Sequence, residues 1–395
     1  MKIGRQFMAD ALSIPVPFND GISRYARVFS GERLALIDYQ EKSASWVKAQ
    51  QSDLISNWYG QSALLRLEQR WVPLSMGCVV DSQTYLASPQ HGYIDYARDE
   101  LDLLQDEQSK RWATRALAVA EPWMSTLGLD RSVSVNAWGV STHLYPKWTL
   151  DKVSLLTDTL VNAFDDRPLW MRTLNEVSDA QLMSHLLANG WQLWPSRQVY
   201  VFDPKDAASW ANRRNNQIDQ KLLRTTSLQL VHPNAFTVQD ADAMARLYAQ
   251  LYLDKHSRWN AEYTSDYFKQ AIAHQWLSFY GFRDEAGNLV AFIGVFADER
   301  TMTTPMLGYD THLPQTMGLY RLLMSKVMAL ALERDLFLNL GAGSSTFKKM
   351  RGGKAVLEWH AFYGRHLPIW QSQTMRFTGW MMGKTVPSFL AKQGL

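Results

Sequence analysis

Apolar and polar residues follow one another along this chain in blocks that alternate between two periods. Short apolar runs are typical of buried strands, whereas apolar residues three and four positions apart indicate a helix that packs one face on a core. The clearest helix pattern covers 318–334, where leucines and other apolar residues form one stripe. The alternation of strand and helix patterns predicts an α/β chain.

The first half of the chain has strand patterns separated by helix patterns. We expect extended segments at 63–81, 84–87, 132–140, 168–174 and 191–203, and helices at 105–127, 150–164 and 178–190. Ser178 with Gln181 has the spacing of a capping box, so Ser178 is the expected N-cap of the last of these helices. A polar helix at 207–224 then indicates a connector.

The second half repeats this plan. We expect helices at 239–253, 264–275 and 318–334, and strands at 276–282, 289–296, 301–309, 336–340 and 356–363. The residues from Arg365 onward are aromatic and basic and are expected to be irregular. A segment that covers the core is the favoured interpretation, with contact to a membrane surface or an apolar carrier as the alternative.

Composition adds limits to this picture. The 395 residues are 46% apolar and include 16 Trp, which suits two packed cores and excludes a disordered chain. Cys78 is the only cysteine and lies in an apolar stretch, so we expect a reducing compartment and a buried thiol. The nine His have no metal-ligand spacing, so no metal is expected. Without a signal-peptide core or a run of 18 apolar residues, the expected location is the cytoplasm.

The net charge of +3 alone is too small to indicate nucleic-acid binding, and no DNA partner is expected. It conceals an asymmetry, since residues 1–200 carry −3 and residues 201–395 carry +6. From Leu336 onward, the chain has eight Lys and Arg residues and a single acidic residue, Glu358. This basic flank favours a ligand with phosphates in the second half.

A glycine-rich segment after the predicted strand 336–340 is the first candidate for such a ligand. Its candidate ligand-binding residues are Gly341, Gly343, Ser344, Lys348, Lys349 and Arg351. Free N–H groups at a helix start, with cations beside them, can hold a phosphate. The alternative is a tight strand-to-helix turn with a solvated basic side.

A second candidate turn opens the long helix at 318–334. Gln315 and Gly318 form a QxxG pattern between a strand and this helix. Amides at such a turn suit a pyrophosphate. The tetrapeptide alone recurs by chance, so its position between the two elements is what makes it informative.

These two turns together resemble the GNAT acyltransferase superfamily. The resemblance rests on Gly318-Leu319-Tyr320 at the helix start, on Leu338 to Gly343, and on Phe347 to Gly353, and it spans about 237–365. It is strongest to BioF2-like acetyltransferase domains and to Fem-type aminoacyl transferases, which pair two GNAT-like lobes. The resemblance implies two tandem GNAT-like lobes, each a mixed, mostly antiparallel sheet flanked by helices.

We therefore expect a degenerate first lobe at 1–204 that frames the acceptor, a connector at 205–236, and an acyltransferase lobe at 237–395. The resemblance implies that the donor's pyrophosphate lies on Gln315, Met317, Gly318, Leu319 and Tyr320, and that its carbonyl lies along Met306 to Asp310. Tyr309 and Asp310 become candidates for the general acid. Two features depart from the family pattern: Tyr320 stands where a small residue is usual, and the tyrosine usual before the last strand is missing.

The segment after the first helix of the second lobe is expected to border the acceptor site. Lys255 can recognise a carboxylate, and His256 can accept a proton because histidine titrates near neutrality. A solvated polar loop is the alternative.

The resulting functional hypothesis is a cytoplasmic N-acyltransferase. Its donor would be a thioester, either acyl-CoA or an acyl carrier protein, and its acceptor the amine of a small metabolite. The first alternative is a Fem-type transferase that uses aminoacyl-tRNA. The second is a non-catalytic binding protein with a degenerate GNAT fold.

Overall fold

The computed structural model describes residues 37–49, 51–67, 70–77, 84–104 and 106–393. In the first half, the strands are β1 (Gly60–Leu67), β2 (Arg70–Gly77), β3 (Val133–Val135), β4 (Leu169–Asn175) and β5 (Gln192–Phe202). The helices are α1 (Ile37–Lys48), α2 (Gln51–Leu54), α3 (Ala97–Asp99), α4 (Glu107–Ser125), α5 (Leu150–Ala163) and α6 (Ala180–Ala188), with short turns η1 (His91–Tyr96), η2 (Glu100–Leu103) and η3 (Leu129–Arg131).

The second half continues in the same manner. Its strands are β6 (Gln229–Val231), β7 (Ser278–Arg283), β8 (Leu289–Ala297), β9 (Thr301–Tyr309), β10 (Phe337–Asn339) and β11 (Lys354–Tyr363). Its helices are α7 (Ala207–Trp210), α8 (Arg214–Thr225), α9 (Ala241–Tyr252), α10 (Ser265–Ala273), α11 (Leu319–Glu333), α12 (Ser345–Met350) and α13 (Ile369–Gln393), with short turns η4 (Pro204–Asp206), η5 (Pro233–Ala235), η6 (Val238–Asp240) and η7 (Gln315–Met317).

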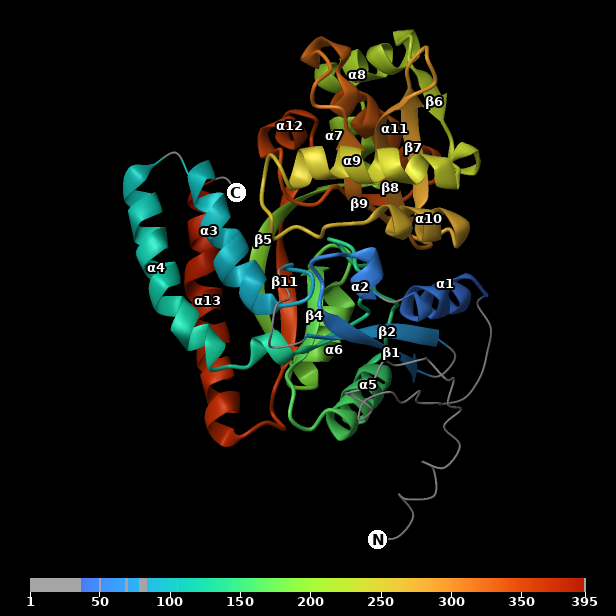
Figure 1. Ribbon diagram of the computed structural model, residues 1–395. Helices are drawn as coiled ribbons and strands as arrows, with labels where there is room; N and C mark the ends of the chain where they lie inside the picture. Colours follow the sequence, from blue (N-terminus) through green and yellow to red (C-terminus); the bar gives the residue numbers. More distant parts are fainter. Residues whose placement is uncertain (1–36, 50, 68–69, 78–83, 105, 394–395) are drawn as a thin grey trace.

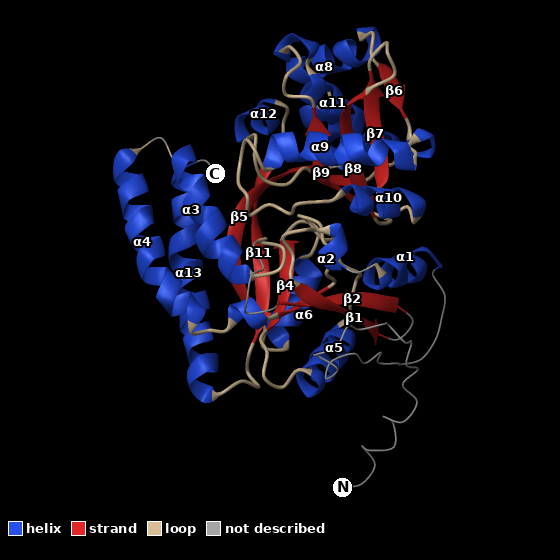
Figure 2. Ribbon diagram, in the orientation of Figure 1, coloured by secondary structure: helices blue, strands red, loops and turns tan. Residues whose placement is uncertain are grey.

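Among the described residues, all strands belong to one sheet with the order β1-β2-β3-β4-β11-β5-β10-β9-β8-β7-β6. Figure 1 shows the helices around this sheet, with α4 and α13 side by side at one flank, and Figure 2 separates strands from helices by colour. The predicted fold class, α/β with helices that flank mixed and mostly antiparallel sheets, is confirmed. The separate sheets expected for two tandem lobes are joined into one.

Helices α9 and α11 cover opposite faces of the second half of the sheet. Successive residues of a strand point to opposite faces. On β8, Phe292 belongs to the core that α9 shares, whereas its neighbour Ile293 belongs to the core of α11. The whole of β8 up to Phe296 is buried for this reason.

The two halves of the chain exchange strands. Strand β5, the last strand of the first half, lies between β10 and β11 and pairs antiparallel with both. Strand β11, from the second half, lies between β5 and β4. The sequence pattern of two successive lobes does not reveal this exchange, because pattern and spacing do not specify which strands pair.

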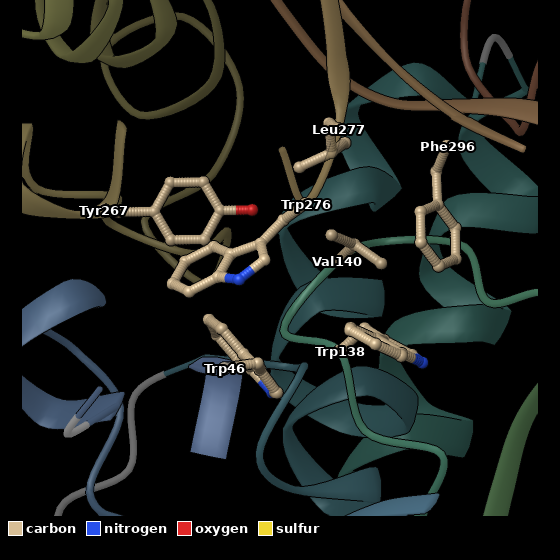
Figure 3. A pocket seen from close by; sticks show the side chains of 7 residues that line it. All are labelled: Trp46, Trp138, Val140, Tyr267, Trp276, Leu277 and Phe296. Atoms are coloured by element: carbon tan, nitrogen blue, oxygen red, sulfur yellow. The ribbon is translucent and has the colours of Figure 1, made fainter. Parts of the chain in front are cut away.

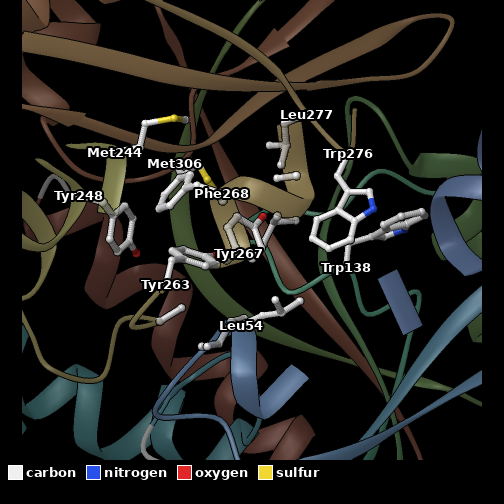
Figure 4. Close-up of a cluster of buried hydrophobic side chains, with 14 of the residues drawn as sticks. Leu54, Trp138, Met244, Tyr248, Tyr263, Tyr267, Phe268, Trp276, Leu277 and Met306 are labelled. Atoms are coloured by element: carbon white, nitrogen blue, oxygen red, sulfur yellow. The ribbon is translucent and has the colours of Figure 1, made fainter. Parts of the chain in front are cut away.

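One hydrophobic core also contains residues of both halves. Figure 4 shows Leu54 and Trp138 from the first half packed with Tyr263, Tyr267 and Trp276 from the second. The large aromatics of this cluster are almost fully buried. The halves therefore share apolar packing as well as a sheet.

Some predicted boundaries in the first half are wrong. The segment 84–87 is a turn, and the strand predicted at 132–140 is limited to 133–135. Asp179, not Ser178, is the N-cap of α6. The side-chain oxygen of Asn175 accepts hydrogen bonds from the amides of Val177 and Ser178, so this turn delays the helix start.

The segment from Arg365 onward is also different from the prediction, because residues 369–393 form the long helix α13. Its buried face includes the polar residues Gln371, Ser372 and Thr378, whereas Trp370 and Phe377 are exposed. The apolar positions therefore do not mark the buried face, and the usual helix signal is absent.

Two sequence expectations lie outside the described residues, namely those for Cys78 and for the N-terminal segment. In the part of the chain that the structure describes, no helix combines the length and the apolar character needed to cross a membrane.

Candidate active site

Strand β9 bends away from β10 at a bulge. Thr304 and Pro305 oppose Val295 alone, where the register with β8 shifts. Proline cannot donate to a strand ladder, so a bulge is one of the few places in a sheet that it fits. Strand β10 pairs with β9 only over Thr301–Thr303. Beyond this point the two strands diverge.

Two backbone amides face the divergence. The N–H of Asp310 donates to Val290 of β8 at 2.9 Å. Because N–H groups alternate sides along an antiparallel strand, those of Leu307 and Tyr309 face the other side, where β10 has diverged. Preorganised amides of this kind can stabilise an oxyanion.

A loop of the first half lies at this divergence. The Ser141 hydroxyl donates to the Pro305 carbonyl at 2.7 Å. A Cβ atom on Gly341, which follows β10, would lie 3.9 Å from Thr142 Oγ1. Residues 141–142 therefore contact both of the diverging elements.

The turn before α11 uses two of its five predicted ligand amides in hydrogen bonds of its own. The N–H groups of Met317 and Gly318 donate to carbonyls inside the turn, each at 3.0 Å. Leu319 and Tyr320 open α11, and amides at a helix start have no partner within the helix. Gln315 is exposed beside them. The turn thus offers the amides of Leu319 and Tyr320 to a ligand.

Tyr320 occupies the space between the two candidate turns. Its ring meets that of Phe347 in a T-shaped contact at 4.8 Å and lies 6.3 Å from the ring of Tyr309. Burial raises the pKa of Tyr320 to about 12, and a hydrogen bond with Ser344 opposes this shift. Ser344 is the N-cap of α12, so Tyr320 connects the start of α11 with the start of α12.

The glycine-rich turn after β10 has a left-handed backbone at three residues. Gly341, Gly343 and Ser344 have φ angles of 65°, 73° and 45°. This conformation favours glycine at the first two positions.

Lys348 lies inside this turn and not on its outer side. Its side chain is 3% exposed, and its ammonium group donates to the carbonyls of Leu340, Gly341 and Ala342 at 2.8, 3.0 and 2.6 Å. Burial, followed by the charge of Arg197, lowers the pKa of Lys348 to about 7. Lys348 therefore fixes the turn and has no open path to a phosphate.

Arg351 is also committed to the protein. Its Nε donates to Asp219 of α8 at 2.6 Å, and the same carboxylate accepts from Arg321 at 2.6 Å. Lys349 is exposed and lies 5.8 Å from the ring of Tyr200. Of the three cations predicted to bind a ligand, Lys349 alone lies at the surface.

A group of tyrosines joins the two halves beside Tyr309. Burial, then the phenols of Tyr320, Tyr85 and Tyr309, raise the pKa of Tyr252, and Arg197 lowers it. Tyr252 belongs to α9 of the second half, whereas Tyr85 and Arg197 belong to the first. These groups are thus close enough to influence one another.

Arg197 belongs to a charged cluster that also contains Glu358, and its charge acts on Tyr252. Its Nε donates to the fully buried Glu358 at 2.8 Å, and its NH2 group donates to the Ser141 carbonyl at 3.1 Å. Nearby Glu100 remains accessible to water, yet desolvation by surrounding protein raises its pKa, while Arg197 and Tyr96 oppose the shift.

The predicted acceptor loop faces the first half. Ser257 donates to Asp99 at 2.6 Å, and Tyr85 N–H donates to the Trp259 carbonyl at 3.0 Å. The ring of His256 lies 6.2 Å from that of Tyr252. Burial and then the charge of Lys255 lower the pKa of His256, so it is neutral near pH 7.

Two of the predicted site residues, Met306 and Asp310, have contacts within the protein that do not fit the predicted roles. Met306 is fully buried in the shared core of Figure 4, so it does not contact a ligand in this state. The carboxylate of Asp310 accepts the N–H of His312 at 2.9 Å and shapes the turn after β9. Tyr309, half-buried at the end of β9, remains beside the free amides, and burial raises its pKa.

A small apolar pocket lies within the core that the two halves share. Figure 3 shows its lining, which includes Trp46, Trp138 and Trp276. The volume open to a water-sized sphere is about 10 Å³, which is hardly enough for one water molecule. Among the described residues, no group of His, Cys, Asp or Glu has the arrangement of a metal site.

Residues 212–349 match the family model of the acetyltransferase (GNAT) domain. The chain carries a GNAT domain. This domain includes β9, the start of α11 and the glycine-rich turn, the elements on which the resemblance rests. No curated protein matches the chain.

Solved structures with a similar arrangement belong to several groups. The chain is similar to FemX, with 8% identity and a TM-score of 0.44, over 61% of this chain and 82% of that one. It is similar to L-PGS from Bacillus licheniformis, with 12% identity and a TM-score of 0.41, over 63% and 83%. It is also similar to a tandem GNAT protein from the clavulanic acid biosynthesis pathway, with 13% identity and a TM-score of 0.33, over 59% and 75%.

Proposed function

We propose that this GNAT protein is an N-acyltransferase that moves an acyl group from a thioester to the amine of a small molecule. The observation that carries the proposal is the pair of free amides of Leu307 and Tyr309, which face the divergence of β9 and β10. A carbonyl placed there is polarised, and the oxyanion of a tetrahedral intermediate gains hydrogen bonds.

The residues around these amides fit the remaining steps. The amine nitrogen attacks the carbonyl carbon, the C–N bond forms, and the C–S bond breaks. Tyr309 is suited to protonate the departing thiolate, and neutral His256 is suited to take the proton that the amine loses. Lys255, the exposed neighbour of His256 in the chain, can attract an anionic part of the acceptor.

The positions of the cations favour a donor on an acyl carrier protein over free acyl-CoA. Lys348 and Arg351 are bound to protein groups, and Tyr320 fills the space between the two turns. This leaves few groups for the several phosphates of coenzyme A. A carrier protein delivers the thioester on an arm without the adenosine diphosphate portion.

The small number of groups available for the phosphates of coenzyme A also supports a second candidate, an aminoacyl-tRNA-dependent transferase. Its donor ester also arrives without coenzyme A. Arg214, which opens α8, can contribute to contact with a polynucleotide. Salt-sensitive tRNA binding without any thioester effect would favour this candidate.

A donor and variant experiment tests the proposal. The protein is incubated with acetyl-CoA, acyl carrier protein thioesters or aminoacyl-tRNA and a mixture of amines, and amide products are detected by mass spectrometry. Tyr309→Phe is expected to lower kcat at least tenfold without a change in Tm. Tyr280→Phe, on β7, is the control for a buried tyrosine and should keep full activity. Absence of product with every donor would favour the non-catalytic interpretation.

A further inference from the structure

The charged cluster around Arg197 contains one arginine without a hydrogen-bonded counterion among the described residues. Arg172 of β4 is 2% exposed. Its Nε has no hydrogen-bond partner, and its guanidinium forms no ion pair with any residue that the structure describes. The buried carboxylate of Glu358 accepts from Arg197 through Oε1, whereas its Oε2 has no hydrogen-bond partner in the described structure. The charge of Glu358 also acts on Arg172, but no hydrogen bond joins the two.

The surroundings of Arg172 hold it in place without neutralising it. Its Cζ lies 5.2 Å from the ring centroid of Tyr85 and 5.3 Å from that of Trp170. Aromatic faces stabilise a cation modestly, but a buried charge without a partner is costly. The accessible carboxylate Glu100 acts on Arg197. Within the buried part of the cluster, two guanidinium groups thus face one carboxylate.

His143 supplies a second polar group without a partner. It is 4% exposed, and neither ring nitrogen has a hydrogen-bond partner in the described structure. Burial, then the charges of Arg172 and Arg197, lower its pKa well below the usual value. The neutral ring can donate one N–H without adding charge.

Arg197 connects this charged cluster to β9 through two hydrogen bonds. Arg197 donates to the carbonyl of Ser141, and Ser141 donates to the carbonyl of Pro305. The residues that surround the charged cluster, Tyr85 and Arg197, are the ones that influence Tyr252 beside Tyr309. A ligand that reached from Arg172 to the amides of β9 would need a carboxylate at one end and a reacting group at the other.

We propose that Arg172 and His143 bind the carboxylate of the acceptor, which is then an amino acid or another small amine that carries a carboxylate. The acceptor role rests on the proposed function, whereas carboxylate binding does not. One bound carboxylate would offset the positive charge of Arg172 and would accept hydrogen bonds from both Arg172 and His143.

Matched ligands test this proposal on the full-length protein. The twenty L-amino acids and the carboxamides of the same amino acids are compared by thermal shift and calorimetry. At least one amino acid is expected to raise Tm and to bind at least tenfold more tightly than its carboxamide. Equal binding of the pair, or no effect of any amino acid, would overturn the proposal.

Variants locate the bound carboxylate. Arg172→Met is expected to abolish the preference for the amino acid over its carboxamide. Arg283→Met, which removes an arginine paired with Asp240 at the other end of the sheet, should retain it. Should Arg172→Met not fold, the comparison of matched ligands on the unaltered protein decides. If an amino acid binds more tightly than its carboxamide but is never acylated, the proposed function is wrong, whereas the proposal of a carboxylate site still holds.

A second, independent observation is an aromatic surface on α4 and α13. The exposed fractions are 58% for Trp112 and 42% for Trp123 on α4, and 57% for Trp370, 51% for Phe377 and 62% for Trp380 on α13. The helices lie side by side in Figure 1, and the ring centroids of Trp123 and Phe377 are 6.2 Å apart. We call these five residues the aromatic face. Exposed apolar patches of this kind mark interaction surfaces.

The charge beside the aromatic face indicates its partner. Over the 25 residues of α13 there are three cations, Arg376, Lys384 and Lys392, and no carboxylate. Tryptophan and basic residues on one helix are typical of segments that lie in the interface of an anionic bilayer. We infer that the aromatic face binds the surface of a membrane with anionic lipids.

Vesicle sedimentation tests this inference. The protein is expected to sediment with phosphatidylglycerol vesicles and much less with phosphatidylcholine vesicles, and added salt should weaken the binding. The double variant Trp370→Ser, Trp380→Ser should lose at least tenfold in affinity. Leu187→Ser, a change of an exposed leucine on α6, is the control. Failure to bind any vesicle, or a double variant that instead converts a dimer to a monomer in light scattering, would overturn the inference.

Discussion

At the scale of single residues, Lys348 shows that a lysine expected to bind a ligand can instead be buried and bind the protein's own backbone. In the sequence it belongs to a basic cluster after a glycine-rich turn, a pattern typical of phosphate sites. In the structure its ammonium group holds three carbonyls of that turn. The pattern locates the turn correctly but does not show whether the lysine points inward or outward.

We predict that Lys348→Met destabilises the fold by about 2–4 kcal/mol, because it leaves three buried carbonyls without a donor. Lys349→Met, a change at an exposed neighbour, is expected to have an effect within about 0.5 kcal/mol. Urea unfolding of both variants measures this difference. Equal stability of the two variants would show that the three hydrogen bonds contribute little.

The charged cluster was not predicted from the sequence. Arg172, Arg197 and Glu358 each lie in an ordinary strand pattern, and 161 residues separate Arg197 from Glu358. Only the exchange of β5 and β11 brings them together. Tyr309 and Tyr320, in contrast, lie next to helix and strand ends that the sequence does mark, so they were recognisable as candidates.

At the scale of elements, the close contact of α9 with β9 sets the position of Tyr252. A Cβ atom on Gly308 of β9 would lie 2.7 Å from the backbone carbon of Leu247 and 2.7 Å from the backbone nitrogen of Tyr248. A side chain at this position must therefore displace the helix backbone.

Gly308→Ala is accordingly predicted to cost about 1–3 kcal/mol of stability and to reduce any acyl transfer. Gly92→Ala is the matched control, because a Cβ atom there would meet its nearest neighbour at 3.7 Å. Chemical denaturation of the two variants provides the measurement. A Gly308→Ala variant as stable as the control would mean that α9 moves away from β9 without cost.

The start of α6 provides a prediction for pH. Burial raises the pKa of Asp179 to about 6 from 3.8, while hydrogen bonds from Ser178 and Asn175 oppose the shift. The folded state thus binds this proton more tightly than the unfolded state, so the free energy of unfolding should fall as pH rises from about 4 to about 6. Asp179→Asn removes this contribution.

The stability of Asp179→Asn relative to the unaltered protein is therefore expected to increase between pH 4 and pH 6, by at most about 2 kcal/mol because the residue is partly accessible. Urea titrations at several pH values give the comparison. A difference that does not change with pH would show that the carboxyl titrates normally in the folded protein.

Most elements were predictable because their apolar residues face a core in the regular way. Helix α11 was predicted at 318–334 and spans 319–333. Helix α13 was missed because its exposed face carries the large aromatics. A pattern that assumes buried apolar residues fails where a helix presents such residues outward.

At the scale of the whole molecule, the strand exchange makes each half incomplete. Without β5, strand β10 loses its antiparallel neighbour and β11 loses one of its two partners. Without β11, strand β4 retains only its short pairing with β3. The shared core adds apolar surface that each half would expose alone.

We therefore predict that fragments 1–204 and 205–395 do not fold when each is expressed alone, although the sequence pattern suggests two successive lobes. Co-expression should restore a complex with the circular dichroism spectrum of the intact chain, because all strand pairings then become available. The intact protein should unfold in one cooperative transition in calorimetry, since neither half retains a complete sheet after the other unfolds. Two separated transitions, or a soluble and cooperatively folded fragment 205–395, would show that the exchanged strands contribute little to the stability of each half.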